Sequence, residues 1–163
     1  FPKKWIKTLS KAKELVVMFS IDGVDEVGEF VRYGFKQKRF EANLRKWLDF
    51  LKDQDTTIYY HYVVHIMNVL NYEKSMNFLK NFRGEVWLSM VHSPKYLNLN
   101  ILPDKIKQYI SNKIKSKSII NHMMSGQYDK TQCDDFLKYI FFLENRMNVP
   151  KEISIIRDKL IYD

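Results

Sequence analysis

The stretch that decides the fold class is Leu15-Val16-Val17-Met18-Phe19-Ser20-Ile21-Asp22-Gly23. Its first five residues are all apolar, which is typical of a parallel strand that is covered on both faces by helices or that lines a closed barrel. Ser20 and Asp22 then follow on one face of the predicted strand, at its end. Because α/β enzymes bind ligands beyond the carboxyl ends of parallel strands, we expect both side chains to line a ligand site.

Changes in the hydrophobic period predict an alternation of strands and helices after this stretch. The expected elements are a helix end over 3–12, strands over 15–21, 57–67 and 86–91, a loop over 22–38, a helix from about Phe40 to Leu51, and a helix over 72–82 that Gly84 ends. Such an order implies a parallel sheet with right-handed crossovers, whose strand ends meet at one edge. Ser20, Asn68 and His92 are therefore expected near one another.

From Pro103 onward the period is helical, with a break at Ser125-Gly126-Gln127. We therefore divide the chain into a sheet region over 1–102 and a helical C-terminal extension over 103–163. No internal repeat, low-complexity run or flexible linker separates the two.

Composition narrows the class of protein. The 163 residues contain no apolar run near the roughly 20 residues that cross a bilayer, which predicts a soluble protein without a membrane partner. Cys133 is the only cysteine, so a reduced, cytoplasmic setting is the simplest expectation. The chain starts at Phe1 without an initiator methionine, which suggests a piece of a longer protein.

The residues after the first strand carry a family resemblance. Ser20-Ile21-Asp22-Gly23 is followed by Glu29-Phe30-Val31-Arg32-Tyr33-Gly34 and, after a short gap, by Asn43-Leu44. This resembles the segment S-I-D-G-x(4)-E-Y-I-R-Y-G-x(5)-V-x-x-N-I of radical S-adenosylmethionine (SAM) enzymes, in the group with a short "twitch" type C-terminal extension. The resemblance continues through 63–71 and 94–103, and it extends into 136–146.

The resemblance implies a fold, cofactors and contact residues. The fold would be the C-terminal half of a partial (β/α)6 radical SAM barrel. The complete protein would use SAM and a [4Fe-4S] cluster that three cysteines of a CxxxCxxC loop hold. Ser20, Asp22, Arg32 and Asn68 are the residues that match positions near SAM, with Arg32 pairing either a SAM carboxylate or an acid that holds the loop closed. Asn71, Arg39 and Arg45 are weaker candidates.

The chain also departs from the family. CxxxCxxC is absent, and the single thiolate of Cys133 cannot hold a cubane cluster. We therefore expect this chain alone to be inactive and the cluster loop to lie upstream of Phe1. The implied activity belongs to the whole protein: reductive cleavage of SAM and modification of an unknown substrate, with a peptide or protein among the candidates, supported by a reductant protein.

Histidines and aromatic residues suggest other sites, which we weigh lower. His61 and His65 share one face of the predicted second strand, but no cysteine or carboxylate joins them or His92 at a metal-ligand spacing, so a structural role is favoured over a metal site. The aromatic residues of the second and third strands suit strand packing better than base stacking, since a covered strand lacks the exposure that stacking needs. These residues are Tyr59, Tyr60, Tyr62 and Trp87.

Two alternative functions remain open. One is a binding or scaffold protein of the same fold without a cluster. The other is a nucleic-acid-binding α/β module, which the formal charge of +8 invites. It requires a stripe of lysines on the helix after Pro103, but their spacing predicts several faces, so nucleic acid is the less favoured partner. The lysines are Lys105, Lys107, Lys113, Lys115 and Lys117.

Overall fold

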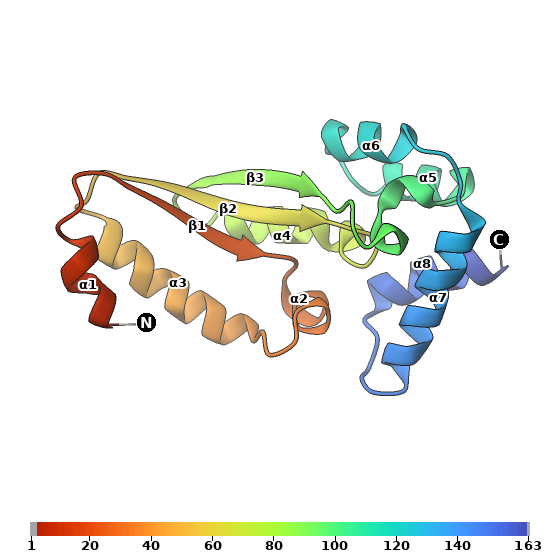
Figure 1. The fold of residues 1–163 in the computed structure, drawn as a ribbon, viewed down its shortest axis with the longest axis horizontal. Helices are drawn as coiled ribbons and strands as arrows, with labels where there is room; N and C mark the ends of the chain where they lie inside the picture. Colours follow the sequence, from red (N-terminus) through yellow and green to blue (C-terminus); the bar gives the residue numbers. More distant parts are fainter. Residues whose placement is uncertain (1–2, 163) are drawn as a thin grey trace.

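The computed structural model describes residues 3–162, and it is an α/β structure with one three-stranded parallel sheet (Figure 1). The elements in chain order are α1 (Lys3–Leu9), β1 (Leu15–Ile21), α2 (Asp25–Val31), α3 (Gln37–Leu51), β2 (Thr56–Val64), η1 (Val69–Asn71), α4 (Tyr72–Leu79), β3 (Glu85–Met90), η2 (Lys95–Leu97), η3 (Leu99–Ile101), α5 (Asp104–Ser111), α6 (Lys117–Met124), α7 (Lys130–Glu144) and α8 (Lys151–Tyr162). Residues 1 and 2, at the start of the predicted sheet region, and residue 163, at the end of the predicted helical extension, lie outside the described residues.

The strands lie in the order β1-β2-β3, and both pairings are parallel. Ser20 is paired with His61, and His61 is paired with Trp87. In a parallel sheet, paired residues point to the same face, so these three side chains form a row across all three strands. Within the described residues, β1 and β3 each have a neighbouring strand on one side only.

Helices α3 and α4 cover one face of the sheet. Trp47 of α3 meets the ring of Phe19 edge-on, with 6.4 Å between ring centroids, and Tyr72 of α4 meets Tyr62 in the same way at 5.9 Å. Tyr60 and Tyr62 on this face are fully buried. The core of the sheet region therefore lies between the sheet and these two helices (Figure 1).

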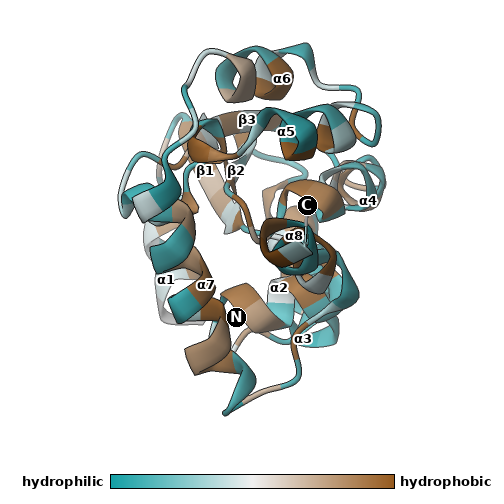
Figure 2. Cartoon of the chain, turned by 90° about the vertical axis from the view of Figure 1, so that its right-hand side faces the viewer, coloured by the Kyte–Doolittle hydropathy of each residue, from teal (hydrophilic) through white to brown (hydrophobic). Residues whose placement is uncertain are grey.

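Helices α5 to α8 lie beyond the carboxyl end of the sheet (Figure 1). Figure 2 looks onto this end and shows that apolar and polar stretches alternate along these helices. Their buried residues, among them Ile110, Phe136 and Ile153, belong to one continuous hydrophobic core with Ile21 and Tyr62 of the sheet. The helical region thus closes the end of the sheet where ligand sites are expected.

Most predicted elements are present, with three corrections. The predicted loop over 22–38 contains α2 and the start of α3. The second strand ends at Val64, and Ile66 and Met67 are buried in the following turn, which explains their apolar character. Gly84 does not end α4, whose C-cap is Lys80.

Gly84 has a different role, at the start of β3. Its φ of +134° is a conformation that side chains rarely adopt, and an added Cβ would lie 2.8 Å from side-chain atoms of Ile58 and Tyr60. Gly84 is therefore required for close packing of β3 against β2.

The lysines of the nucleic-acid hypothesis do not form one stripe. Lys107 is 1% exposed, and its ammonium group donates to the carbonyl oxygen of Gly126 at 2.7 Å. Burial lowers the pKa of Lys107, although the nearby Asp104 opposes that shift. Lys107 thus anchors the loop after α6 instead of facing a polyanion.

Candidate functional site

The face of the sheet opposite α3 and α4 is open in the described part of the chain. It carries Val16, Met18 and Ser20 from β1, Thr57, Tyr59, His61 and Val63 from β2, and Glu85, Trp87 and Ser89 from β3. Val16 is 65% exposed and Trp87 is 55% exposed. The apolar first strand is thus covered by helices on one face only. The prediction that Trp87 packs inside a covered sheet is wrong, because its side chain is exposed on the open face.

A salt bridge closes the carboxyl end of β1. Nε of Arg32 lies 3.1 Å from Oδ2 of Asp22, and a terminal nitrogen of the same guanidinium donates to the carbonyl oxygen of Ser20 at 3.1 Å. Arg32 therefore pairs an acid of its own loop, which is one of the two roles expected for it. The hydroxyl of Ser20 lies on the open face, since Ser20 is exposed and shares the row of His61.

Asn68 fastens the same loop from the other side. It is completely buried, and its amide nitrogen donates to the carbonyl oxygens of Asp22 at 2.9 Å and Val63 at 2.8 Å. Its amide oxygen accepts from the backbone N–H of His65 at 2.8 Å. Both donors of the Asn68 amide are therefore bound to backbone, which leaves this side chain to position the strand end.

Asn71 and two glycines hold α2 against the strand end. The amide oxygen of Asn71 accepts from the backbone N–H of Val24 at 2.9 Å. Gly28 of α2 lies so close to Gly23 that an added Cβ would come 2.4 Å from the Gly23 carbonyl oxygen. The S-I-D-G strand end is thus fixed by contacts that only glycine permits, and Arg32 reaches back to it because α2 is short.

His61 is the functional candidate that the sequence analysis set aside. Its Nε2 lies 2.8 Å from the hydroxyl oxygen of Ser89 on β3, and its ring centroid is 5.7 Å from that of Trp87. The sequence alone could not place these residues together, because the register that aligns Ser20, His61 and Trp87 depends on strand pairing. The alternation of buried Tyr60 and Tyr62 with more exposed Tyr59 and His61 is the signal that could have indicated it.

The carboxyl group of Asp22 is influenced by both Arg32 and His61. Burial raises the pKa of its carboxyl group, while the positive charge of Arg32 and, to a smaller degree, His61 pull it down. Asp22, at the end of β1, thus interacts electrostatically with both Arg32 and His61. Together with the Ser20 and Ser89 hydroxyls and the exposed Trp87 ring, the site can stack on a planar group and hydrogen-bond its polar edge.

His65 does not join His61. Strand β2 ends before it, and His65 is 8% exposed, with no hydrogen-bond partner for Nδ1 within the described residues. Burial lowers its pKa to about 4, so it is neutral at physiological pH. The expectation that His61 and His65 share a strand face is therefore wrong.

The weaker arginine candidates lie on the outer surface of α3. Arg45 pairs with Glu41 and stacks over the ring of Phe82 with 5.0 Å to its centroid, and Arg39 is exposed. His92 lies against His122 of α6, with 5.7 Å between ring centroids.

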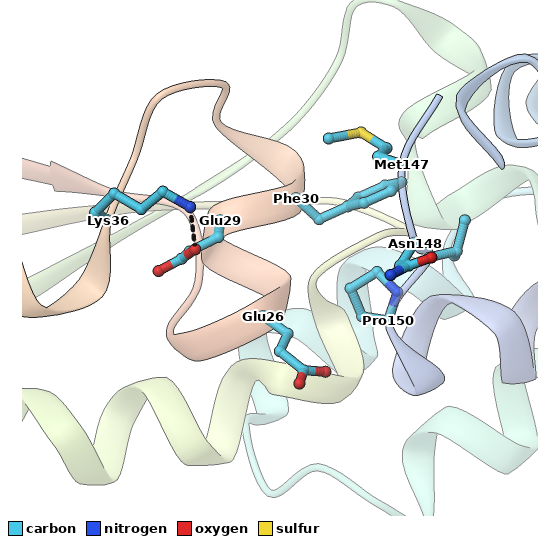
Figure 3. Close-up of a pocket in the computed structure, with 8 residues that line it drawn as sticks. Glu26, Glu29, Phe30, Lys36, Met147, Asn148 and Pro150 are labelled. Atoms are coloured by element: carbon cyan, nitrogen blue, oxygen red, sulfur yellow. Dashed lines mark hydrogen bonds and ion pairs between the residues drawn. The ribbon is translucent and has the colours of Figure 1, made fainter. Parts of the chain in front are cut away.

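A groove of about 430 Å³ lies between α2 and the loop that joins α7 to α8 (Figure 3). Glu26 and Glu29 of α2 line it opposite Met147, Asn148 and Pro150, and Lys36 pairs with Glu29 at 2.6 Å. The four predicted SAM-contact residues lie outside this groove. It borders the α2 segment that Gly23 and Gly28 hold in place.

The described residues contain no group of three or more histidine, cysteine or acidic side chains that could hold a metal ion, and no helix among them is long and apolar enough to cross a membrane. No protein-family model, curated protein or solved structure gives a significant match to the chain.

Proposed function

We propose that this chain is the C-terminal part of a radical SAM enzyme and contributes half of its barrel and part of its SAM site. The complete protein would cleave SAM reductively and modify a substrate, with a peptide or protein side chain as the class to test first. The proposal rests on the S-I-D-G resemblance and on the geometry of the strand end that carries it.

The observation that carries the proposal is the open face of the sheet. Helices cover one side of three parallel strands, while Val16, Met18 and Trp87 are exposed on the other. A barrel has helices outside and side chains inside, so an apolar, helix-free face beside two single-sided strands fits a half barrel that further strands would close. Exposed apolar surface of this kind usually marks an interaction site.

The residues present fit the two cofactors to different degrees. The Ser20 hydroxyl is on the open face, and the Asp22–Arg32 pair shapes the strand end beside it, as a SAM contact would require. Asn68 acts one step away, through the backbone of Asp22. The cluster does not fit this chain, since Cys133 is the only thiol and is buried at α7. The proposal therefore requires cluster ligands in another part of the protein.

The decisive experiment starts with the reading frame upstream of Phe1. The proposal predicts a CxxxCxxC motif there, and an upstream region without the three cysteines would overturn it. If the motif is present, the full-length protein should be purified without oxygen, reconstituted with iron and sulfide, and assayed for 5′-deoxyadenosine released from SAM under reducing conditions.

Two variants connect that assay to this chain. Ser20→Ala should weaken SAM binding by about tenfold, the effect of losing one good hydrogen bond in a closed site. Lys46→Ala, an exposed position on the outer side of α3, is the matched control and should leave SAM binding unchanged. Equal SAM affinity in both variants would remove Ser20 from the site.

A binding or scaffold protein of the same fold is the second candidate. The fixed strand end supports this function as well as it supports a catalytic one. Hydrogen bonds to backbone occupy the amide donors of Asn68 and one nitrogen of Arg32, so the loop is rigid without any cofactor. This candidate predicts an intact upstream half barrel that lacks the cysteines and a protein that forms no 5′-deoxyadenosine.

A further inference from the structure

His92, just after the end of β3, and His122 of α6 form a pair of imidazoles. Their ring centroids are 5.7 Å apart, and the ring planes are nearly perpendicular, at 82°. His92 is exposed in the segment after β3, whereas His122 is partly buried on α6. The chain has four histidines, and the other two, His61 and His65, lie in and just after β2.

Hydrogen bonds fix the protonation of His122. The side-chain oxygen of Asn98 accepts from the backbone N–H of Asn100 at 3.0 Å, and Nε2 of His122 lies 3.0 Å from the same oxygen. A backbone N–H can only donate, so the atom that faces it must be the amide oxygen. Nε2 of His122 must then carry the proton, and Nδ1 keeps its lone pair.

Such an arrangement is typical of metal-binding histidines. They donate one ring N–H to a fixed oxygen and ligate through the other nitrogen, and the oxygen partner holds the ring in place. Asn98 is itself 6% exposed and held by Asn100, so it is a rigid partner.

The separation of the rings also suits one shared ion. A metal bound at about 2.0–2.1 Å from an imidazole nitrogen is about 3.2 Å from the ring centroid, so two rings on a tetrahedral ion have centroids about 5.2 Å apart. The observed distance of 5.7 Å exceeds this by a few tenths of an ångström. His92 is exposed and can close that difference by a small side-chain rotation.

We propose that His92 and His122 bind one divalent transition-metal ion of the zinc class, with Asn98 orienting His122. Because the described residues offer no third histidine, cysteine or acid at the pair, water or an oxygen of a bound molecule fills the remaining positions. The site is independent of the proposed SAM chemistry.

The test is a calorimetric titration of the tag-free protein with Zn²⁺ alone, with Mg²⁺ as the ion that imidazoles do not favour. We expect one Zn²⁺ per chain, no Mg²⁺ binding, and a loss of about tenfold or more in Zn²⁺ affinity in both His92→Ala and His122→Ala. Lys46→Ala, an exposed position on α3, is the control and should bind Zn²⁺ like the unchanged protein.

Zn²⁺ binding that is absent, or that is unchanged in His92→Ala and His122→Ala, would overturn the proposal. His92 is exposed, so we expect His92→Ala to fold normally, and its Zn²⁺ affinity can be compared directly with that of the unchanged protein. A second readout needs no variant: nitrogen NMR of the metal-free protein should show His122 protonated at Nε2, and the opposite tautomer would contradict the site.

Discussion

Arg32 and Asp22 form an ion pair across the loop that follows β1, with 3.1 Å between Nε and Oδ2. The Asp22 side chain is 19% exposed and that of Arg32 is 46% exposed, so the pair is neither a free surface bridge nor a fully buried one. Burial raises the pKa of Asp22, and Arg32 is the stronger of the two groups that oppose this.

Arg32→Ala should lower the free energy of unfolding by about 1–2 kcal/mol, between the values for surface and buried pairs. The loss should be larger at neutral than at acidic pH, because Asp22 is charged and unpartnered only when deprotonated. Urea denaturation at the two pH values measures both. An equal loss at each pH would mean that Arg32 acts through the Ser20 carbonyl instead.

Asn68→Ala should be more damaging than any of the other predicted site changes. The variant leaves two partly buried carbonyl oxygens and one buried backbone N–H without the Asn68 amide, which should cost about 2–4 kcal/mol. Asn81→Ala is a suitable control, because Asn81 is exposed and bonds only to the end of its own helix. Similar losses in the two variants, measured by urea denaturation, would contradict the anchoring role of Asn68.

Gly28→Ala tests the contact between α2 and the strand end, because the substitution should lower the stability of the protein where it would normally raise it. Glycine to alanine within a helix normally stabilises by about 1 kcal/mol. Here the new Cβ would meet the Gly23 carbonyl oxygen at 2.4 Å, so we expect the opposite, a loss of about 2 kcal/mol. Gly34→Ala is the comparison, because Gly34 has a φ of +79° but an added Cβ would meet nothing within 4 Å. Thermal unfolding of the two variants therefore separates the loss of stability caused by a clash from the loss caused by backbone strain alone.

His65 should make the protein less stable as the pH falls. Its pKa drops from 6.5 to about 4 on folding, so the unfolded chain binds more protons between these values. Stability is then complete above pH 6.5 and is lost as the pH falls toward 4, by about 2 kcal/mol between neutral pH and pH 5. Denaturant melts should show this slope flattened in His65→Gln and kept in Asn81→Ala, a change at an exposed residue that does not titrate.

The local elements could largely be predicted from the sequence, because their patterns are local. The limits of β1 match the predicted strand, since a run of apolar residues followed by a polar loop leaves few alternatives. Helix α2 is not predictable from the local pattern, because Gly28 in its centre argues against a helix. The stability of α2 depends on a contact with Gly23 that only the folded chain provides. The sequence predicts too long a second strand, because buried turn residues such as Ile66 have the same apolar character as strand residues.

The candidate site was less predictable because it depends on which residues meet. The strand end and the resemblance both indicate Asp22, whereas the resemblance alone indicates Arg32; pairing of Arg32 with an acid of its own loop is one of the two roles expected for it. The contact of His61 with Ser89 joins residues on neighbouring strands, and nothing in either local pattern specifies it. The tautomer of His122 depends in the same way on Asn98, which lies in a different element.

The exposed residues of β1 have a practical consequence for work with this chain. Val16 and Met18 are exposed on a strand whose outer edge is unpaired in the described residues, and an apolar edge strand invites pairing with strands of other molecules. We therefore expect the isolated chain to self-associate as its concentration rises. Val16→Lys should keep it monomeric to higher concentration, because a charge on an edge strand blocks intermolecular sheet growth.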